Sequence, residues 1–171
     1  CAPDVRATGE TDTRPRVVIV GAGFGGLSAA KALHKADVRV TLVDRRNHHL
    51  FQPLLYQVAA GAVSAAEIAQ PLRSIFRRQR NVSVVLGEVS RVDLERRRVL
   101  IDGAGGSPAA VPYDTLIVAA GSRYVYFGHD EWRPFAPELK TLEGARDTRR
   151  RILRAFEAAE LEHDAARRAA W

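Results

Sequence analysis

The chain reads RVVIVGAGFGG at residues 16–26, where an apolar, β-branched strand runs directly into a loop of glycines. Gly21, Gly23 and Gly26 match the pattern G-x-G-x-x-G. In this pattern the first glycine permits a tight turn, the second lets the backbone approach a pyrophosphate, and the third lets the helix pack closely on the strand. The N-terminus of the helix offers N–H groups and the positive end of its dipole to an anion. The stretch therefore predicts a phosphate-binding turn.

The residues that follow supply the context that this pattern needs. Residues 27–35 are good helix formers, and residues 38–43 form a second apolar strand that ends at Asp44. Asp44 follows the glycines by about twenty residues, where the pattern places an acid that binds ribose hydroxyls. Arg45 and Arg46 come next, and arginine here can accommodate a 2′-phosphate, whereas the acid favours free hydroxyls. A dinucleotide site is thus predicted, the alternative being a glycine-rich turn in an ordinary α/β protein.

The middle of the chain predicts a helix and then three strands. Ser64 and Glu67 have capping-box spacing, and apolar residues recur at helical spacing to Arg78, with a kink or a break into two helices expected at Pro71. Strands are expected at 81–86, 88–93 and 98–102, the last two antiparallel. They would form a β-meander inserted into a parallel sheet.

Two further elements complete the pattern. Residues 113–121 read as a buried strand that ends in small side chains, which allow a ligand to approach the carboxyl end of the sheet. Thr141 is a candidate N-cap for a helix whose apolar face carries Ile152, Leu153, Phe156 and Leu161. The fold class expected is α/β, with a Rossmann-like parallel sheet.

Composition excludes several classes of protein. The single cysteine, Cys1, excludes an internal disulfide framework and any C-x-x-C redox or zinc motif. No apolar run approaches the roughly eighteen residues of a membrane span. The net charge of +6 comes from short arginine runs without a nucleic-acid recognition motif, so an anionic membrane surface is a better partner than nucleic acid.

Length and chain ends suggest one domain of a longer protein. The chain has 171 residues, begins at Cys1, contains no methionine and reaches Trp171 within a helical pattern that lacks a stop signal. We expect a flexible tail at 1–14, a cofactor-binding domain at 15–144, and a helix at 145–171 that leads toward a domain absent from this chain.

Three stretches resemble the type II (non-proton-pumping) NADH dehydrogenases, which are flavoproteins with two dinucleotide folds. They read VDRRNHHLFQPLLYQVA at 43–59, EIAQPLR at 67–73 and YFGHDEW at 126–132. The resemblance implies that this part binds FAD, that NADH binds through a domain not in this chain, and that electrons pass to a membrane quinone. It further implies a respiratory-chain enzyme, peripheral on the cytoplasmic face of the inner or plasma membrane and capable of forming a homodimer.

The same resemblance implies which residues meet the FAD. Four glycines would lie at the pyrophosphate, Asp44 and Arg45 at the adenosine half, Val89 at the adenine, and the remaining positions along the flavin ring. The implied cofactor-binding residues are Gly21, Gly23, Gly25, Gly26, Asp44, Arg45, Gln52, Pro53, Val89, Ala120 and Gly121. We name no acid–base catalyst, because the flavin carries the chemistry in such enzymes.

Alternatives remain at this stage. Another FAD-dependent reductase, of the sulfide:quinone or ferredoxin type, would share the first domain, and a fragment that binds flavin without catalysis is the non-enzymatic alternative. His48 and His49 suggest a metal site, but adjacent histidines without spaced carboxylate or thiol partners are poor ligands. Tyr126, Phe127 and Trp132 are expected to pack as core under the next domain rather than to contact the flavin.

Overall fold

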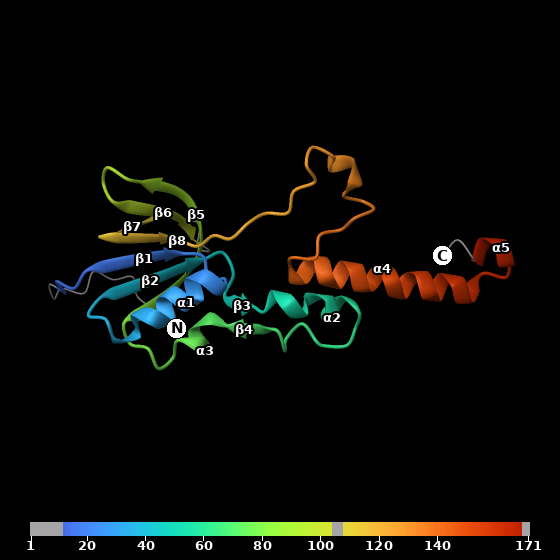
Figure 1. Ribbon diagram of the computed structural model, residues 1–171, viewed down its shortest axis with the longest axis horizontal. Coiled ribbons are helices and arrows are strands. Elements are labelled where there is room, and N and C mark those ends of the chain that lie inside the picture. Colours follow the sequence, from blue (N-terminus) through green and yellow to red (C-terminus); the bar gives the residue numbers. More distant parts are fainter. Residues whose placement is uncertain (1–11, 104–107, 169–171) are drawn as a thin grey trace. The chain divides into compact units, whose positions relative to one another are not determined.

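The computed structural model describes residues 12–103 and 108–168, which form two compact units along the chain (Figure 1). Of the described residues, the first unit contains 12–47, 72–103 and 108–120, and the second contains 48–71 and 121–168. Residues 1–11 of the expected tail and residues 169–171 of the expected last helix lie outside the described residues. The expected boundary at 144/145 stays a prediction.

The first unit is built on a six-stranded sheet in the order β7-β6-β5-β2-β1-β8. β1 (Arg16–Val20) pairs in parallel with β2 (Arg39–Asp44) on one side and with β8 (Thr115–Val118) on the other. Helix α1 (Phe24–Ala32) and the 3₁₀ turn η1 (Leu33–Lys35) connect β1 to β2. The α/β fold with a mostly parallel sheet is therefore confirmed.

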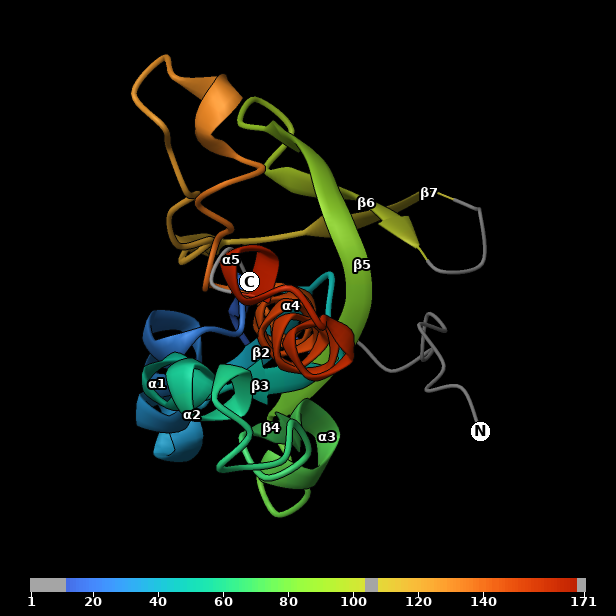
Figure 2. The same ribbon diagram turned by 90° about the vertical axis from the view of Figure 1, so that its right-hand side faces the viewer.

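β5 (Val82–Asp93) is one long strand that pairs with two different strands along its length. Its first half pairs in parallel with β2, and its second half pairs antiparallel with β6 (Arg98–Gly103), which in turn pairs with β7 (Pro108–Pro112). The register shifts between Val89 and Arg91, and Figure 2 shows β5 bending along its length. The meander predicted from the sequence is thus a continuation of the parallel sheet, because the bulge bends one strand rather than ending it.

Side chains on the two faces of this sheet form separate cores, because successive residues of a strand point to opposite faces. Val17 and Ile19 pack with α1 and with α3 (Leu72–Ile75) on one face. Val18 packs with the meander residues Val99 and Ile101 on the other. The central strands are consequently buried on both faces, as apolar parallel strands require.

The second unit consists of short elements around one long helix. β3 (His48–Leu50) pairs antiparallel with β4 (Ala69–Pro71), and the 3₁₀ turn η2 (Gln52–Leu54) leads into α2 (Leu55–Ala59). Beyond the first unit's β8 come η3 (Asp130–Trp132), α4 (Leu142–Leu161) and α5 (Ala165–Arg168). Thr141 caps α4 as predicted, because its Oγ1 accepts the Gly144 N–H at 3.0 Å.

α2 and the start of α4 form the core of the second unit. Leu55, Val58 and Ala59 of α2 pack against Leu142 and Ala145 of α4, and all five side chains are buried. The later apolar residues of α4, which the sequence placed on the apolar face of the helix, are exposed in this chain, with Phe156 at 69%.

The helix predicted over residues 64–78 is wrong. The Ser64 N–H does donate to Glu67 Oε2 at 2.7 Å, but only turns follow, and residues 69–71 form β4 instead. Pro71 lacks an N–H and disfavours helical backbone at the residue before it. Residues 48–50 provide a partner strand for the residues around Pro71, so the only helix left in this range is the four-residue α3.

Candidate functional site

The glycine loop begins where β1 ends. Gly21 has φ +99°, a conformation that favours glycine, and its N–H donates to Val43 O at 2.8 Å across to β2. Gly23 is the N-cap of α1 with φ −68°, and no acidic residue occupies the first turn of that helix. The first N–H groups of any α-helix lack partners within the helix. The loop therefore directs the N-terminus of α1 toward the carboxyl edge of the sheet.

Two of the fingerprint glycines are required by the protein's own backbone. A Cβ at Gly21 would lie 2.3 Å from Ala119 O, and a Cβ at Gly26 would lie 1.7 Å from Gly21 O. Both distances are far below a normal contact, so no side chain fits at either position while the loop, β8 and α1 remain in place.

The other two glycines have room around them. A Cβ at Gly23 would meet nothing within 4 Å, and a Cβ at Gly25 would make an ordinary contact of 3.8 Å with Ala119 Cβ. Gly23 and Gly25 are both exposed. The protein's own packing thus gives no reason for glycine at position 23, whereas a ligand approaching the backbone there would.

Asp44 holds the glycine loop from the end of β2. Its Oδ2 accepts the Ala22 N–H at 2.6 Å, and its Oδ1 accepts the Arg46 N–H at 2.8 Å. A carboxylate can accept about four hydrogen bonds, so these two leave capacity for ribose hydroxyls. Arg45, the next residue, is exposed. The acid predicted from the sequence therefore lies against the loop with which it was paired.

The strand ends bring further predicted residues to the same edge. Ala119 N–H donates to Val20 O at 2.8 Å, which places the residues after β8 beside the loop after β1, and Ala120 is exposed there. Because β2 and β8 lie on opposite sides of β1, this edge is a topological switch point, where open α/β sheets bind ligands. Val89 lies in β5 at the bulge, beyond the Asp44–Leu86 pair that ends the β2 pairing.

The remaining predicted residues belong to the second unit. Gln52 and Pro53 form the exposed start of η2, and Gly121 has φ +75° with nothing within 4 Å of a Cβ built on it. Their expected place beside a flavin ring stays a prediction.

The aromatic segment after β8 splits into buried and exposed residues. Tyr126 is 8% exposed, and its hydroxyl donates to Ala136 O at 2.6 Å. Trp132 stacks on His129 with ring centroids 4.2 Å apart, while Phe127 is 86% exposed. Within the second unit, Tyr126 is therefore packed and Phe127 is exposed, and the expected packing of this segment under a further domain stays a prediction.

Sequence reasoning missed two residues of the loop, Ala22 and Ala119, which take part through their backbone. Ala22 donates to Asp44, and the carbonyl of Ala119 lies where a Gly21 side chain would be. The only signal in the sequence was the run of small residues at 119–121.

An ion pair fastens the opposite, amino end of the same strands. Both Arg16 Nε and the Arg16 backbone N–H donate to Asp114 Oδ2, at 3.0 and 2.7 Å, and Arg16 Nη2 reaches Oδ1 at 2.8 Å. The Arg16 guanidinium and its backbone N–H hold the pKa of Asp114 well below its usual range. This pair joins β1 to the start of β8, away from the loop.

The part of the chain that the structure describes contains neither a cluster of metal-ligating side chains nor a membrane-spanning helix. Within residues 12–103 and 108–168, no group of three or more His, Cys, Asp or Glu side chains could hold a metal ion. Over those same residues, no helix has the length and apolar character to cross a bilayer.

Comparison with known proteins gives a consistent family. The family model for pyridine nucleotide-disulphide oxidoreductases matches residues 15–166. Two curated proteins of Mycobacterium tuberculosis are similar to this chain. The type II NADH:quinone oxidoreductase Ndh is 51% identical over 98% of this chain and 36% of its own length. The type II NADH:quinone oxidoreductase NdhA is 54% identical over 91% of this chain and 33% of its own length. The resemblance inferred from the sequence is therefore confirmed.

A solved structure shares the fold. NDH2 of Plasmodium falciparum, in complex with NADH, superposes with a TM-score of 0.80 at 22% identity, over 91% of this chain and 32% of its own. The chain thus spans about a third of the length of the proteins it matches.

Proposed function

Because the chain belongs to the pyridine nucleotide-disulphide oxidoreductase family, we propose that it is the FAD-binding part of an NADH:quinone oxidoreductase. The observation that carries the proposal is the geometry of the glycine loop. The protein's own backbone occupies the space that a side chain at Gly21 or Gly26 would need, whereas the space beside Gly23 is open. That arrangement fits a pyrophosphate better than any internal packing role. The similarity to two type II NADH:quinone oxidoreductases supports the choice of reaction.

We assign the FAD contacts as follows. The N-terminus of α1 binds the pyrophosphate, with Gly23 and Gly25 giving room for it. Asp44 accepts the ribose hydroxyls of the adenosine half while it holds the Ala22 N–H. Arg45 lies near that half, and the backbone of Val89 meets the adenine. The flavin half lies along Ala120 and Gly121, with Gln52 and Pro53 near its ring.

Bound FAD would supply the redox chemistry by which two electrons pass from NADH, as a hydride, to a quinone. The chain's own residues bind and orient it, and none of them is assigned a proton-transfer role. We assign NADH binding and the quinone site to parts of a longer protein, since the matched relatives are about three times as long as this chain. We place that protein peripherally on the cytoplasmic face of the inner or plasma membrane, where it reaches a membrane quinone.

The first experiment is to purify the chain and record its visible absorbance. We expect a flavin spectrum, after purification or after incubation with FAD, and release of FAD rather than FMN on denaturation. FMN lacks the adenosine half that Asp44 is proposed to bind. A folded chain that neither retains nor takes up FAD, or that prefers FMN, would contradict the assignment. We also expect little steady-state NADH oxidation by the chain alone, and robust NADH:quinone turnover would contradict the division of roles.

A further inference from the structure

Two amide side chains between α3 and β5 bind the C-terminal end of α1 and the turn that follows it. Gln79 Nε2 donates to Ala30 O at 2.8 Å and to Asn81 Oδ1 at 3.1 Å. Asn81 Nδ2 donates to Leu33 O at 2.8 Å and to Ala36 O at 3.3 Å. The last carbonyls of an α-helix have no partner within the helix. Gln79 and Asn81, which we call the amide clamp, therefore bind carbonyls at the end of α1 and join them to one another.

The amide clamp is itself fixed to the sheet. Asn81 O accepts the Val40 N–H at 2.8 Å, at the point where β2 begins to pair with β5. The Gln79 N–H donates to Phe76 O at 2.9 Å, and Phe76 is buried in the same core as Leu27 of α1. Both clamp residues are partly buried. The clamp therefore holds the C-terminal end of α1 at a set place along β2 and β5.

Side-chain packing restrains α1 less than the length of the helix suggests. All of α1 lies in the described part of the chain, and its buried residues are Gly26, Leu27 and Ala30, so Leu27 is its one bulky buried side chain. A helix resists sliding along a sheet when large side chains interlock with their neighbours, and glycine and alanine offer little to interlock. The hydrogen bonds of the amide clamp supply a restraint along the axis of α1 that this packing lacks.

The two ends of α1 have different tasks. Its N-terminus follows Gly23 and is the proposed pyrophosphate site, whereas its C-terminus lies in the amide clamp. The helix is roughly 13 Å long, and its backbone hydrogen bonds make it stiff enough for a shift at one end to move the other. We propose that Gln79 and Asn81 are positioning residues of the cofactor site, which set where the N–H groups at the start of α1 meet the pyrophosphate of FAD. The inference rests on the proposed function and deepens it, since it gives the site two residues that act through α1 and not by contact.

The test measures FAD affinity in variants that lack the amide clamp. Gln79→Met keeps a side chain of similar length without a donor, Asn81→Ala removes the other amide, and Q79M/N81A removes both. Gln79→Lys restores a donor of similar reach. The FAD dissociation constant of the 171-residue chain is measured by flavin fluorescence, at a temperature well below the Tm of each variant. Amide chemical shifts of Gly23 and Gly25, recorded without FAD, report independently on the N-terminus of α1.

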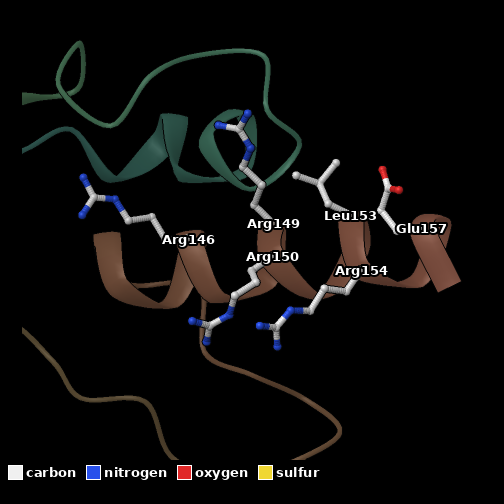
Figure 3. Close-up of a pocket in the computed structure, with 6 residues that line it drawn as sticks. All are labelled: Arg146, Arg149, Arg150, Leu153, Arg154 and Glu157. Carbon is white, nitrogen blue, oxygen red and sulfur yellow. The ribbon is translucent and has the colours of Figure 1, made fainter.

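Two controls separate positioning from stability and from charge. Val99→Ala destabilises the chain through the core on the other face of the sheet from α1. The variant Q79M/L153K adds the same charge as Gln79→Lys, but at an exposed position on α4, where Figure 3 shows Leu153 among arginines. Circular dichroism of each preparation reports folding separately from FAD binding.

We expect Q79M/N81A to weaken FAD binding about tenfold, because a displaced helix N-terminus loses about one well-aligned hydrogen bond to the phosphates. The amide shifts of Gly23 and Gly25 should move in the same variant. Gln79→Lys should bind FAD within about threefold of the parent, and so should Val99→Ala despite its lower Tm. Q79M/L153K should bind FAD as weakly as Gln79→Met does.

Parent-like FAD affinity in Q79M/N81A would overturn the positioning role. An equal loss in Val99→Ala would also overturn it, because lower stability would then explain the effect. If Q79M/L153K regains as much affinity as Gln79→Lys, general charge explains the recovery and the inference fails. A folded parent that takes up no FAD would instead overturn the proposed function, and with it the site that the clamp is proposed to position.

Discussion

The two kinds of glycine in the loop predict opposite consequences for the same chemical change. In Gly26→Ala the new Cβ would lie 1.7 Å from Gly21 O, whereas a normal C···O contact is about 3.3–3.6 Å. The loop or α1 must therefore move by more than about 1.5 Å. We expect a cost of about 3 kcal/mol, the upper end of the overpacking range. For a chain of this size that lowers Tm by about 6–12 °C.

Gly23→Ala should leave the fold nearly intact. Its Cβ meets nothing within 4 Å, and φ −68° suits any residue. Alanine is a weaker N-cap than glycine, which lowers stability, but it also reduces the conformational entropy of the unfolded chain, which raises stability. The two effects oppose each other, so the free energy of unfolding changes by no more than about 1 kcal/mol. The new methyl group would instead occupy the space proposed for the pyrophosphate. An overpacking cost of about 1–3 kcal/mol there weakens FAD binding by about 10- to 100-fold.

The assay separates the two effects. Thermal unfolding is followed by circular dichroism without FAD, because bound ligand would itself raise Tm. FAD affinity is then measured by titrating the apoprotein and following flavin fluorescence. Gly26→Ala serves as the matched control, since it makes the same substitution three residues along the loop. If Gly23→Ala binds FAD within about threefold of the parent, or if Gly26→Ala unfolds at the parent's temperature, the assignment of the loop is refuted.

Three other perturbations test the contacts around the sheet. Asp44→Ala removes the acceptor for Ala22 N–H, so it should lower the free energy of unfolding by about 2 kcal/mol and weaken FAD binding. Asp44→Asn keeps one oxygen and should recover part of that stability when thermal unfolding is measured in the same way. Asn81→Ala removes the Nδ2 donor to Leu33 O at 2.8 Å and should lower Tm by about 2–8 °C; an unchanged Tm would show that this bond does not hold the turn after α1. Arg16 lowers the pKa of Asp114 in the folded chain. The ionised Asp114 carboxylate therefore stabilises the fold fully above its unfolded pKa of about 3.9, and this stabilisation is lost as the pH falls below that value. Unfolding between pH 2 and 5 should accordingly depend less on pH in Asp114→Asn, and an identical acid slope would contradict this role.

Local rules predicted some elements and failed on others for identifiable reasons. The strand, glycine loop, helix and second strand at 16–44 were predicted because the apolar runs and the glycines act within a few residues of one another. The helix over 64–78 was wrong because the pattern there does not reveal the pairing of residues 69–71 with 48–50. β7 was missed because its sequence, PAAVP, has no strong strand signal of its own, and the residues form a strand only by pairing with β6.

The sequence by itself determined the glycine turn after β1, the acid that accompanies it and the family. These features depend on the type of residue at fixed positions within a short stretch of sequence. They can therefore be recognised without knowing which distant parts of the chain come into contact. Only the tertiary structure decided which of the glycines the protein's own backbone requires. Ala119 O lies against Gly21, and Asp44 reaches Ala22 N–H, across 98 and 22 residues of chain. Parallel strands bring such distant residues together, and no short-range pattern records which backbone atoms then meet.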